Sequence, residues 1–326
     1  MTWVVFIITA ALIVLAATQL AKYGDVIATR TKMGGMFIGI LLLAGATSLP
    51  EVLTSISALK ENAPNLAAGN LLGSNTFNMF LLAILDISFR NQRILRKAAL
   101  KHAVTGSLTV FMIGLVVFFM LANIDIKIGF VGLDSLILIG VYVLAVRLIH
   151  KDNQSNVRSE ESLEIPENTP SLLRGIIGFS IAAIALIFIT PVMVKNANLI
   201  AESTGLGTTF IGTTLVALVT SLPELVTTIA AIKIGAADMA IGNLFGSNMF
   251  NMFALGLTDV FYTQGRFLGD IDPSFLLIGI VGLLLTCMGL IGNLIKLERR
   301  VWFVEIDALA IMVFYFASLW LLYIRS

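Results

Sequence analysis

The segment GATSLPEV (residues 45–52) governs how this chain is interpreted, because it places polar residues inside an apolar run that extends from residue 33 to residue 59. A carboxylate in such a run is costly to bury, and a proline interrupts a helix. The core of the segment, TSLPE, recurs at residues 220–224. A costly feature that occurs twice indicates a function rather than an accident of composition.

The composition is that of an integral membrane protein. Of 326 residues, 58% are hydrophobic and 13% are charged, and the mean hydropathy is +0.96. Soluble domains carry about 25% charged residues. The net charge of +1 provides no general attraction for nucleic acid. Apolar runs long enough to cross a bilayer predict ten helices, at residues 2–21, 34–59, 65–87, 98–121, 126–149, 172–200, 207–233, 237–262, 273–295 and 301–324.

An internal repeat predicts the architecture. A shift of 173 residues aligns Gly34–Asp86 with Gly207–Asp259 without a gap, with 29 identities in 53 positions. Each half carries five predicted helices, and an odd number inverts the second half in the membrane. We therefore expect an all-α polytopic membrane protein with ten transmembrane helices in two inverted-topology five-helix repeats, as is typical of secondary transporters. The predicted parts are a first repeat (1–149), a linker (150–171) and a second repeat (172–326).

The distribution of basic residues predicts the orientation. In the predicted topology, 16 of the 21 Lys and Arg residues fall on the side that contains the linker. This side is predicted to be cytoplasmic, so both termini are predicted to be extracellular. The linker is charged, contains two prolines and lacks large aromatic residues, which is typical of a flexible connection.

The two TSLPE segments predict two interrupted helices. Thr47 and Glu51 are four residues apart and share a helix face. Pro50 has no N–H group and crowds the carbonyl four residues earlier, which leaves that carbonyl without its helical partner. The same holds for Pro223, beside Thr220 and Glu224. Irregular backbone at this depth is tolerated where it lines a cavity or binds a ligand. Inverted symmetry would bring both segments to the centre as a pocket of oxygens with two carboxylates.

Oxygen ligands without sulfur or imidazole favour a hard cation over zinc or copper. Two carboxylates carry a charge of −2, which one calcium ion or two sodium ions would neutralise. A shared site that accepts either load, but not both, is the physical basis of an antiporter. The ions are then cargo, and no cofactor and no protein partner are expected.

A second pair of segments supplies neutral oxygens. Asn70, Ser74 and Asn78 recur at every fourth residue along one helix face, and Asn243, Ser247 and Asn251 repeat this spacing. Ser74, Ser247, Asn78 and Asn251 are predicted cation ligands, whereas Asn70 and Asn243 could equally pack or bond to the interrupted helices. Glycines 69, 73, 242 and 246 would allow the helix backbones to approach closely. Asp86 and Asp259 match each other at helix ends, where structural anchoring is favoured.

These motifs resemble the two alpha repeats of the cation/calcium exchanger superfamily, specifically its sodium/calcium exchanger branch with its prokaryotic antiporters. The residues that carry the resemblance are ATSLPE (46–51) with GNLLGSNTFN (69–78), and VTSLPE (219–224) with GNLFGSNMFN (242–251).

The resemblance implies an exchange of three sodium ions for one calcium ion, with net movement of charge, by alternating access. Calcium would be held by Glu51 and Glu224 with the backbone oxygens of Thr47 and Thr220. Sodium would use these carboxylates, the carbonyls of Ala44 and Ala217, and the side chains of Ser48, Ser221, Ser74 and Ser247.

Two alternatives remain open at this point. One is a calcium/proton antiporter that uses the same glutamates, although Thr-Ser in both halves favours sodium, because proton-coupled relatives usually carry Gly-Asn there. The other is a passive cation channel.

The chain also departs from the family pattern, since Ala46 and Val219 stand where many relatives have glycine. Asn251 stands where some microbial relatives have an acid, so the carboxylate count stays at two.

Overall fold

The computed structural model describes residues 1–31, 44–89, 102–156, 169–233, 237–294, 300–301 and 304–325. Its helices are α1 (Thr2–Thr31), α3 (Leu49–Lys60), α4 (Pro64–Ser88), α6 (Ala103–Ala122), α7 (Leu133–Asn156), α8 (Leu172–Thr204), α9 (Gly207–Ile211), α10 (Ala217–Thr220), α11 (Leu222–Lys233), α12 (Ala237–Phe261), α13 (Phe267–Asp270), α14 (Phe275–Leu294) and α15 (Ile306–Arg325). A π-helical turn, η1 (Gly212–Val216), joins α9 to α10. Two short antiparallel hairpins are β1–β2 (Lys127–Ile128 with Val131–Gly132) and β3–β4 (Arg300–Val301 with Val304–Glu305).

The predicted all-α fold is confirmed, and every predicted span contains helix in its described part. For the second span, only residues 44–59 lie within the described residues. Six described helical stretches are long and apolar enough to cross a membrane: Thr2–Thr31, Pro64–Ser88, Ala103–Ala122, Leu172–Thr204, Gly207–Lys233 and Asp307–Ile324. The helix α7 continues to Asn156, so its last turns extend into the predicted linker.

The two hairpins correct two predicted spans. Helix α7 begins at Leu133 rather than at residue 126, and α15 begins at Ile306 rather than at residue 301. In the first hairpin, Gly129 turns the chain with a φ of +69°, a conformation that favours glycine. The first hairpin begins at Lys127 and the second at Arg300, so they are separated by 173 residues, the same shift as in the sequence repeat. The repeat seen in the sequence therefore continues up to the last helix of each half.

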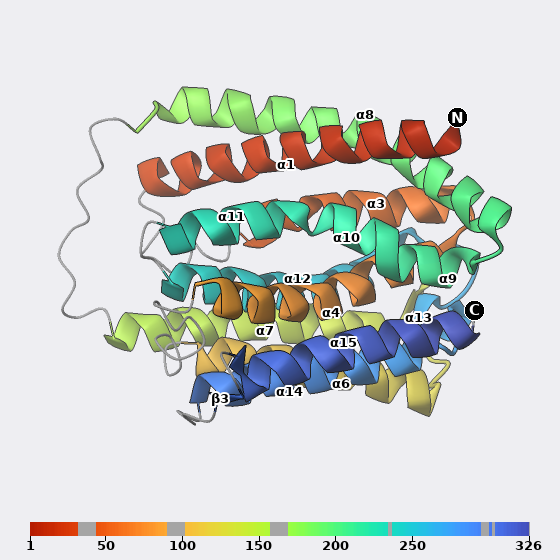
Figure 1. Ribbon diagram of the computed structural model, residues 1–326. Coiled ribbons are helices and arrows are strands. Elements are labelled where there is room, and N and C mark those ends of the chain that lie inside the picture. The colour runs from red at the N-terminus through yellow and green to blue at the C-terminus, as the bar shows by residue number, and fades with distance from the viewer. Residues whose placement is uncertain are drawn as a thin grey trace.

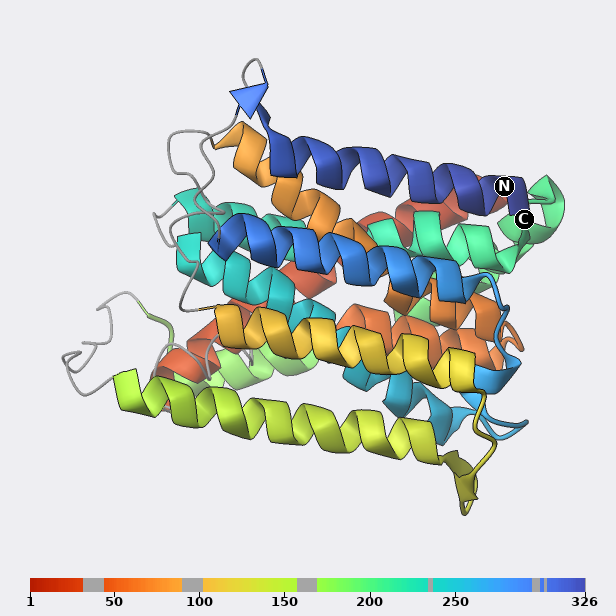
Figure 2. The same cartoon turned by 90° about the horizontal axis from the view of Figure 1, so that it is seen from below.

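Helices α1 and α8 lie side by side along one flank of the bundle, with α3 and the α10–α11 segment next to them (Figure 1). The two helices begin their respective halves, and they run in opposite directions (Figure 1). Both chain termini lie at the same end of the bundle, as the views of Figures 1 and 2 agree. The end of α7 and the start of α8, which flank the predicted linker, lie at the opposite end.

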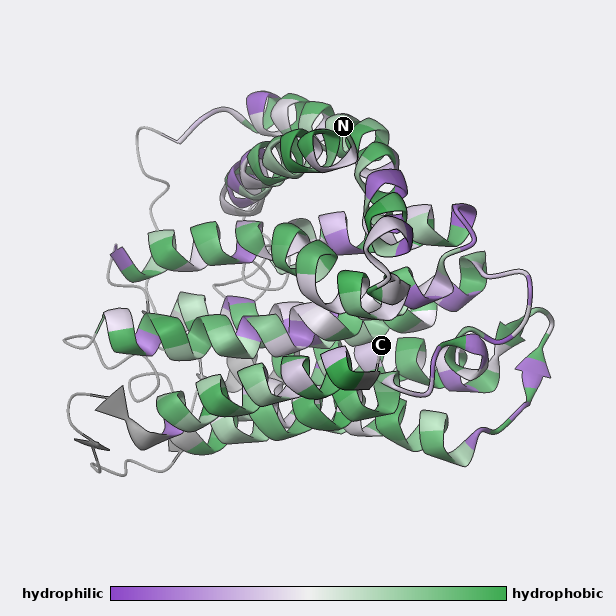
Figure 3. Cartoon of the chain, turned by 45° about the vertical axis from the view of Figure 1, so that its right-hand side comes forward, coloured by the Kyte–Doolittle hydropathy of each residue, from purple (hydrophilic) through white to green (hydrophobic). Residues whose placement is uncertain are grey.

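The flanks of the bundle are apolar, and most hydrophilic residues lie toward the helix ends (Figure 3). Large apolar side chains are well exposed there: Phe188 is 73% exposed, Trp320 63% and Ile7 61%. Contiguous apolar surface of this kind would be unfavourable in water, and it fits the hydrocarbon of a bilayer.

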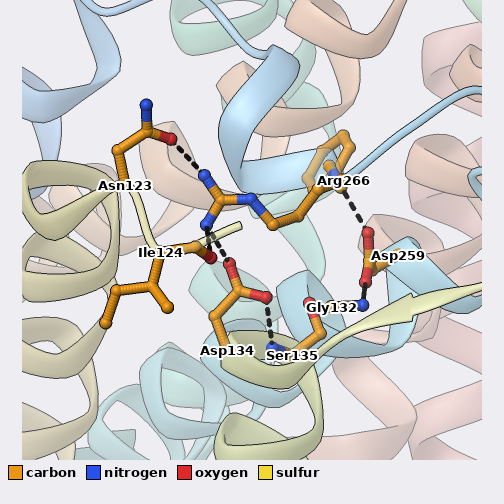
Figure 4. Close-up of polar contacts among 8 residues, drawn as sticks. Asn123, Ile124, Gly132, Asp134, Ser135, Asp259 and Arg266 are labelled. Atoms are coloured by element: carbon orange, nitrogen blue, oxygen red, sulfur yellow. Dashed lines mark hydrogen bonds and ion pairs between the residues drawn. The ribbon is translucent and has the colours of Figure 1, made fainter. Parts of the chain in front are cut away.

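A buried polar cluster ties two loops together (Figure 4). It adjoins α13, which lies at the end of the bundle that holds the termini (Figure 1). Arg266 is 4% exposed, pairs with Asp134 at 3.1 Å, and donates to Ile124 O at 2.9 Å and to Asn123 Oδ1. Asp259 accepts bonds from the backbone N–H groups of Gly132 and Phe267, each at 2.7 Å. Asp259 is thus a structural anchor, as its position at a helix end predicts.

We expect Arg266→Met to destabilise the protein by about 3–5 kcal/mol, because it leaves the buried Asp134 carboxylate without its partner. The measurement is the melting temperature of the purified protein in detergent. The double variant Arg266→Met with Asp134→Leu should recover part of the loss, because it removes the unpaired charge. Gln264→Ala, at an exposed contact with Asn62, is the control. A melting temperature equal to that of the control would contradict this role.

Candidate cation-binding site

Both proline-containing helices are interrupted one residue after the threonine of TSLPE. In the first half, the backbone bonds that flank the break run from Ser48 N–H to Ala44 O (2.9 Å) and from Val52 N–H to Ser48 O (3.3 Å). Within the described residues, no bond from Glu51 N–H to Thr47 O crosses it. The missing helical bonds leave carbonyl oxygens available to a ligand.

The second half repeats the interruption. Ser221 N–H donates to Ala217 O (3.0 Å) and Leu225 N–H donates to Ser221 O (3.2 Å). The π-helical turn η1 lies immediately before this break. Such turns are rare and frequently occur at functional sites. The equivalent residues of the first half, 39–43, lie outside the described residues.

The two carboxylates are fully buried and are bonded across the halves. Ser48 Oγ donates to Glu224 Oε1 at 3.0 Å, and Ser221 Oγ donates to Glu51 Oε1 at 3.3 Å. Both glutamates are 0% exposed, and each is bonded to a serine three residues from the other glutamate. The two bonds join residues that are equivalent under the 173-residue repeat, so each bond is the counterpart of the other. The structure thus brings Glu51 and Glu224 together, as the sequence predicts.

Hydroxyl pairs extend this symmetry. Thr47 Oγ1 lies 3.4 Å from Ser247 Oγ, and its repeat equivalent Thr220 Oγ1 lies 3.5 Å from Ser74 Oγ. Each pair joins the interrupted helix of one half to the long helix, α12 or α4, of the other half. The four hydroxyl groups therefore form two equivalent contacts between the halves.

The carbonyls of Ala44 and Ala217, predicted as sodium ligands, are engaged in local bonds. Ala44 O accepts from Ser48 N–H (2.9 Å) and from Thr47 Oγ1 (3.1 Å). Ala217 O accepts from Ser221 N–H (3.0 Å), whereas the single proton of Thr220 Oγ1, 3.3 Å away, goes to the closer Asn70 Oδ1 (2.9 Å). A cation at Ala44 O would have to displace the Thr47 hydroxyl, which could then itself turn toward the cation.

Glycines allow the helices to cross at backbone contact distance. A Cβ atom on Gly73 would lie 2.5 Å from Thr213 O, and one on Gly69 would lie 2.8 Å from Thr213 N. In the other half, a Cβ atom on Gly246 would lie 3.1 Å from the Cβ atom of Ala44. The predicted close approach is confirmed for these three glycines.

Asn70 links the two halves through side-chain hydrogen bonds. Its Nδ2 donates to Glu51 O (2.9 Å) and Ser55 Oγ (3.0 Å), and its Oδ1 accepts from Thr220 Oγ1 (2.9 Å). Of the two readings that the sequence left open, the structure therefore supports bonding to the interrupted helix. Its equivalent Asn243 donates to Thr227 and Thr228 at 3.1 and 3.3 Å.

Asn78 and Asn251 each bond to an asparagine of the other half that the sequence reasoning did not single out. Asn78 Nδ2 donates to Asn248 Oδ1 (2.9 Å), and Asn251 Nδ2 donates to Asn75 Oδ1 (3.1 Å). The signal for Asn75 and Asn248 was present, because both are identical in the repeat and precede Asn78 and Asn251 by three residues.

Apart from the Thr54 hydroxyl, the unpaired buried polar atoms of α3, α4, α11 and α12 are acceptors. In the described part of the chain, Glu51 Oε2, Glu224 Oε2 and the Oδ1 atoms of Asn78, Asn243 and Asn251 are buried without a hydrogen-bond partner. Among the described Lys and Arg residues, the buried cation is Arg266, which lies at the end of the bundle. Buried acceptors without donors are costly, and a cation would satisfy them.

The donor set identifies the class of cation. The described residues contain no group of three or more His, Cys, Asp or Glu side chains that could hold a metal. A cation here would be held by two carboxylates supplemented by neutral oxygens. Hydroxyl, amide, carbonyl and carboxylate oxygens suit calcium or sodium, and the set offers no nitrogen or sulfur ligand of the kind that transition metals prefer.

Comparisons with known proteins agree with this chemistry. The family described as "Sodium/calcium exchanger protein" matches residues 1–150 and 174–324. The chain is 28% identical over 263 residues to the inner membrane protein YrbG of Escherichia coli, covering 80% of this chain and 79% of that protein. It is 27% identical over 282 residues to the sodium/calcium exchanger MaX1 of Methanosarcina acetivorans, covering 74% and 77%. The solved structure of the sodium-calcium exchanger NCX_Mj has a similar fold, with a TM-score of 0.61 and 22% identity over 100% of this chain and 98% of that one.

We expect Gly73→Ala to be more damaging than its repeat equivalent Gly246→Ala. The new methyl group would meet a backbone oxygen at 2.5 Å in the first case and a side-chain carbon at 3.1 Å in the second. Overpacking against backbone that cannot move typically costs about 1–3 kcal/mol. Melting temperatures of the two variants in detergent give the comparison. Equal or reversed losses would show that the crossing of α4 and η1 is looser than described.

Proposed function

This chain belongs to the sodium/calcium exchanger protein family, and on that premise we propose that it exchanges sodium for calcium across the cell membrane by alternating access. The family is one of transporters, not enzymes. The observation that carries the proposal is the pair of buried carboxylates, Glu51 and Glu224, each bonded to a serine of the other half and each left with one unpartnered oxygen.

Charge balance links the two cargoes. The carboxylates together carry −2, so one calcium ion or two sodium ions leave the centre neutral. Buried uncompensated charge costs several kcal/mol, which disfavours both an empty ionised site and a site that holds both loads. An exchange in which one load must leave before the other binds follows from this balance.

The roles of the individual ligands complete the proposal. Calcium lies between Glu51 and Glu224 and takes the carbonyl oxygens of Thr47 and Thr220. Sodium uses the same carboxylates, the hydroxyls of Ser48, Ser221, Ser74 and Ser247, and the carbonyls of Ala44 and Ala217. Asn78 and Asn251 add neutral oxygens. A third sodium ion, which the resemblance to the family implies, carries one positive charge beyond this balance and makes the exchange electrogenic.

We also propose the membrane arrangement. Ten helices cross the membrane as two inverted five-helix repeats, residues 1–149 and 172–326. The segment 150–171 is cytoplasmic, and both termini are extracellular. The placement of both termini at one end of the bundle, opposite the ends of α7 and α8 that flank the segment, supports this arrangement. So does the excess of Lys and Arg on the side predicted to be cytoplasmic.

A sodium gradient imposed on proteoliposomes that contain the purified chain should drive the uptake of radioactive calcium. The expected flux saturates with calcium, needs no pH gradient, and responds to membrane potential in the direction of three sodium ions per calcium. Flux driven by a pH gradient alone would instead support calcium/proton exchange with the same glutamates. Flux that needs no counter-ion gradient and does not saturate would support a channel.

Glu51→Gln and Glu224→Gln should each lower the exchange rate by more than about 100-fold. Each change keeps the size of the side chain but leaves a charge of −1 against a divalent ion, at a cost of several kcal/mol. The rate is measured in the same sodium-gradient assay at equal protein content. Glu61→Gln, at an exposed position after α3, is the matched control and should retain the unmodified rate. Full exchange by either site variant would refute the assignment of the carboxylates.

A further inference from the structure

Four buried asparagines form a hydrogen-bonded chain between α4 and α12, with Asn75 and Asn248 in its middle and Asn78 and Asn251 at its ends. Asn78 Nδ2 donates to Asn248 Oδ1 (2.9 Å), and Asn248 Nδ2 donates to Asn75 O (3.2 Å). In the repeat-equivalent pair of bonds, Asn251 Nδ2 donates to Asn75 Oδ1 (3.1 Å), and Asn75 Nδ2 donates to Asn248 O (3.4 Å). All four side chains are 0–1% exposed. The chain of bonds thus uses every side-chain nitrogen, and the side-chain oxygens of Asn78 and Asn251 stay unpartnered.

The backbone carbonyls of Asn75 and Asn248 determine the orientation of the four side-chain amides. A carbonyl oxygen can only accept, so the end of Asn75 that faces Asn248 O must be its nitrogen. The oxygen of Asn75 then faces Asn251, which must donate with its own nitrogen. The remaining end of Asn251 is therefore its oxygen. The same argument applies to the other pair. The end of Asn248 that faces Asn75 O must be its nitrogen, so its oxygen faces Asn78, which must donate with its nitrogen. The remaining end of Asn78 is therefore its oxygen.

The orientation of the Asn78 and Asn251 amides decides whether the site attracts or repels a cation. The two ends of a carboxamide are almost equal in size, so packing alone does not distinguish them. A reversed Asn251 would set its oxygen against Asn75 Oδ1 and present two N–H groups in place of a free acceptor. Asn78 and Asn251 occupy the same helix faces, one turn along, as Ser74 and Ser247, whose hydroxyls contact Thr220 and Thr47.

We propose that Asn75 and Asn248 are positioning residues, which set cation affinity by holding Asn251 and Asn78 with their oxygens directed at the cation. The inference rests on the proposed function, in which Asn78 and Asn251 are ligands. Each half of the protein thereby orients a ligand that belongs to the other half. Removing such a second layer of support typically weakens metal affinity by 10–100-fold.

The test is a double-variant cycle read by equilibrium binding of calcium to the purified full-length chain. Asn75→Leu should weaken calcium binding about tenfold. In an Asn251→Ala background it should have no further effect, because the ligand that it orients is absent. In an Asn78→Ala background its effect should multiply with that of Asn78→Ala, since Asn75 does not bond to Asn78. A merely structural role would give the same pattern in both backgrounds.

Two further variants sharpen the test. An Asn251→Asp side chain presents oxygen whichever way it turns, so adding Asn75→Leu to it should not weaken calcium binding, because it removes no orienting bond and only relieves a contact between two acceptor oxygens. Thr258→Val is the control: Thr258 lies on α12, is buried, and bonds only within its helix, to Ala254 O at 2.7 Å. It should bind calcium like the unmodified chain. The mirrored set, Asn248→Leu with Asn78→Ala, is made in parallel, so that the outcome does not depend on the folding of one variant.

The outcomes separate this inference from the proposed function. Unchanged calcium affinity in Asn75→Leu, or effects that multiply in the Asn251→Ala background, would overturn the positioning role even if the chain exchanges sodium for calcium. The predicted cycle in a chain that shows no sodium-driven calcium flux would support the positioning role and overturn the exchange. A chain that binds no calcium would overturn both.

Discussion

The structure depends on the need to satisfy two carboxylates inside an apolar bundle. Glu51 and Glu224 are fully buried, and each accepts a serine hydroxyl from the opposite half. The serine that bonds to each glutamate belongs to the other half, so one half by itself could not bury its glutamate with this partner. The crossed bonds leave one oxygen of each carboxylate unpaired, so the protein's own groups do not fully satisfy the two buried carboxylates.

The surrounding backbone brings the oxygens together. The prolines and the residues before them interrupt two helices, and glycines let α4 cross η1 at backbone contact distance. The two halves nevertheless differ in detail. Asn70 donates to Glu51 O, whereas Glu224 O accepts from Thr227 Oγ1, to which Asn243 donates. One sequence motif therefore supports two hydrogen-bond arrangements.

Much of the fold was predictable, and the failures have physical reasons. Long apolar runs and the repeat are local or periodic signals, so helices such as α4 and α12 were predicted within a few residues. The hairpins at 127–132 and 300–305 were missed, because short apolar segments beside a helix carry the same hydropathy as the helix itself. The engaged carbonyl of Ala44 was also missed, since whether a threonine hydroxyl bonds back to its own helix depends on its surroundings.

The sequence by itself determined that the chain is an apolar, twofold-repeated helical protein with one glutamate and one proline in each interrupted helix. These properties are written in composition and spacing, which need no knowledge of contacts. Only the tertiary structure decided which hydroxyl meets which carboxylate, that Asn70 bonds to the interrupted helix, and that Asn75 and Asn248 accept bonds from Asn251 and Asn78. The serine–glutamate bonds and the asparagine–asparagine bonds join residues that are 170–176 positions apart in the chain. The polarity of an amide or hydroxyl is set by the groups that packing places around it, not by its neighbours in the chain.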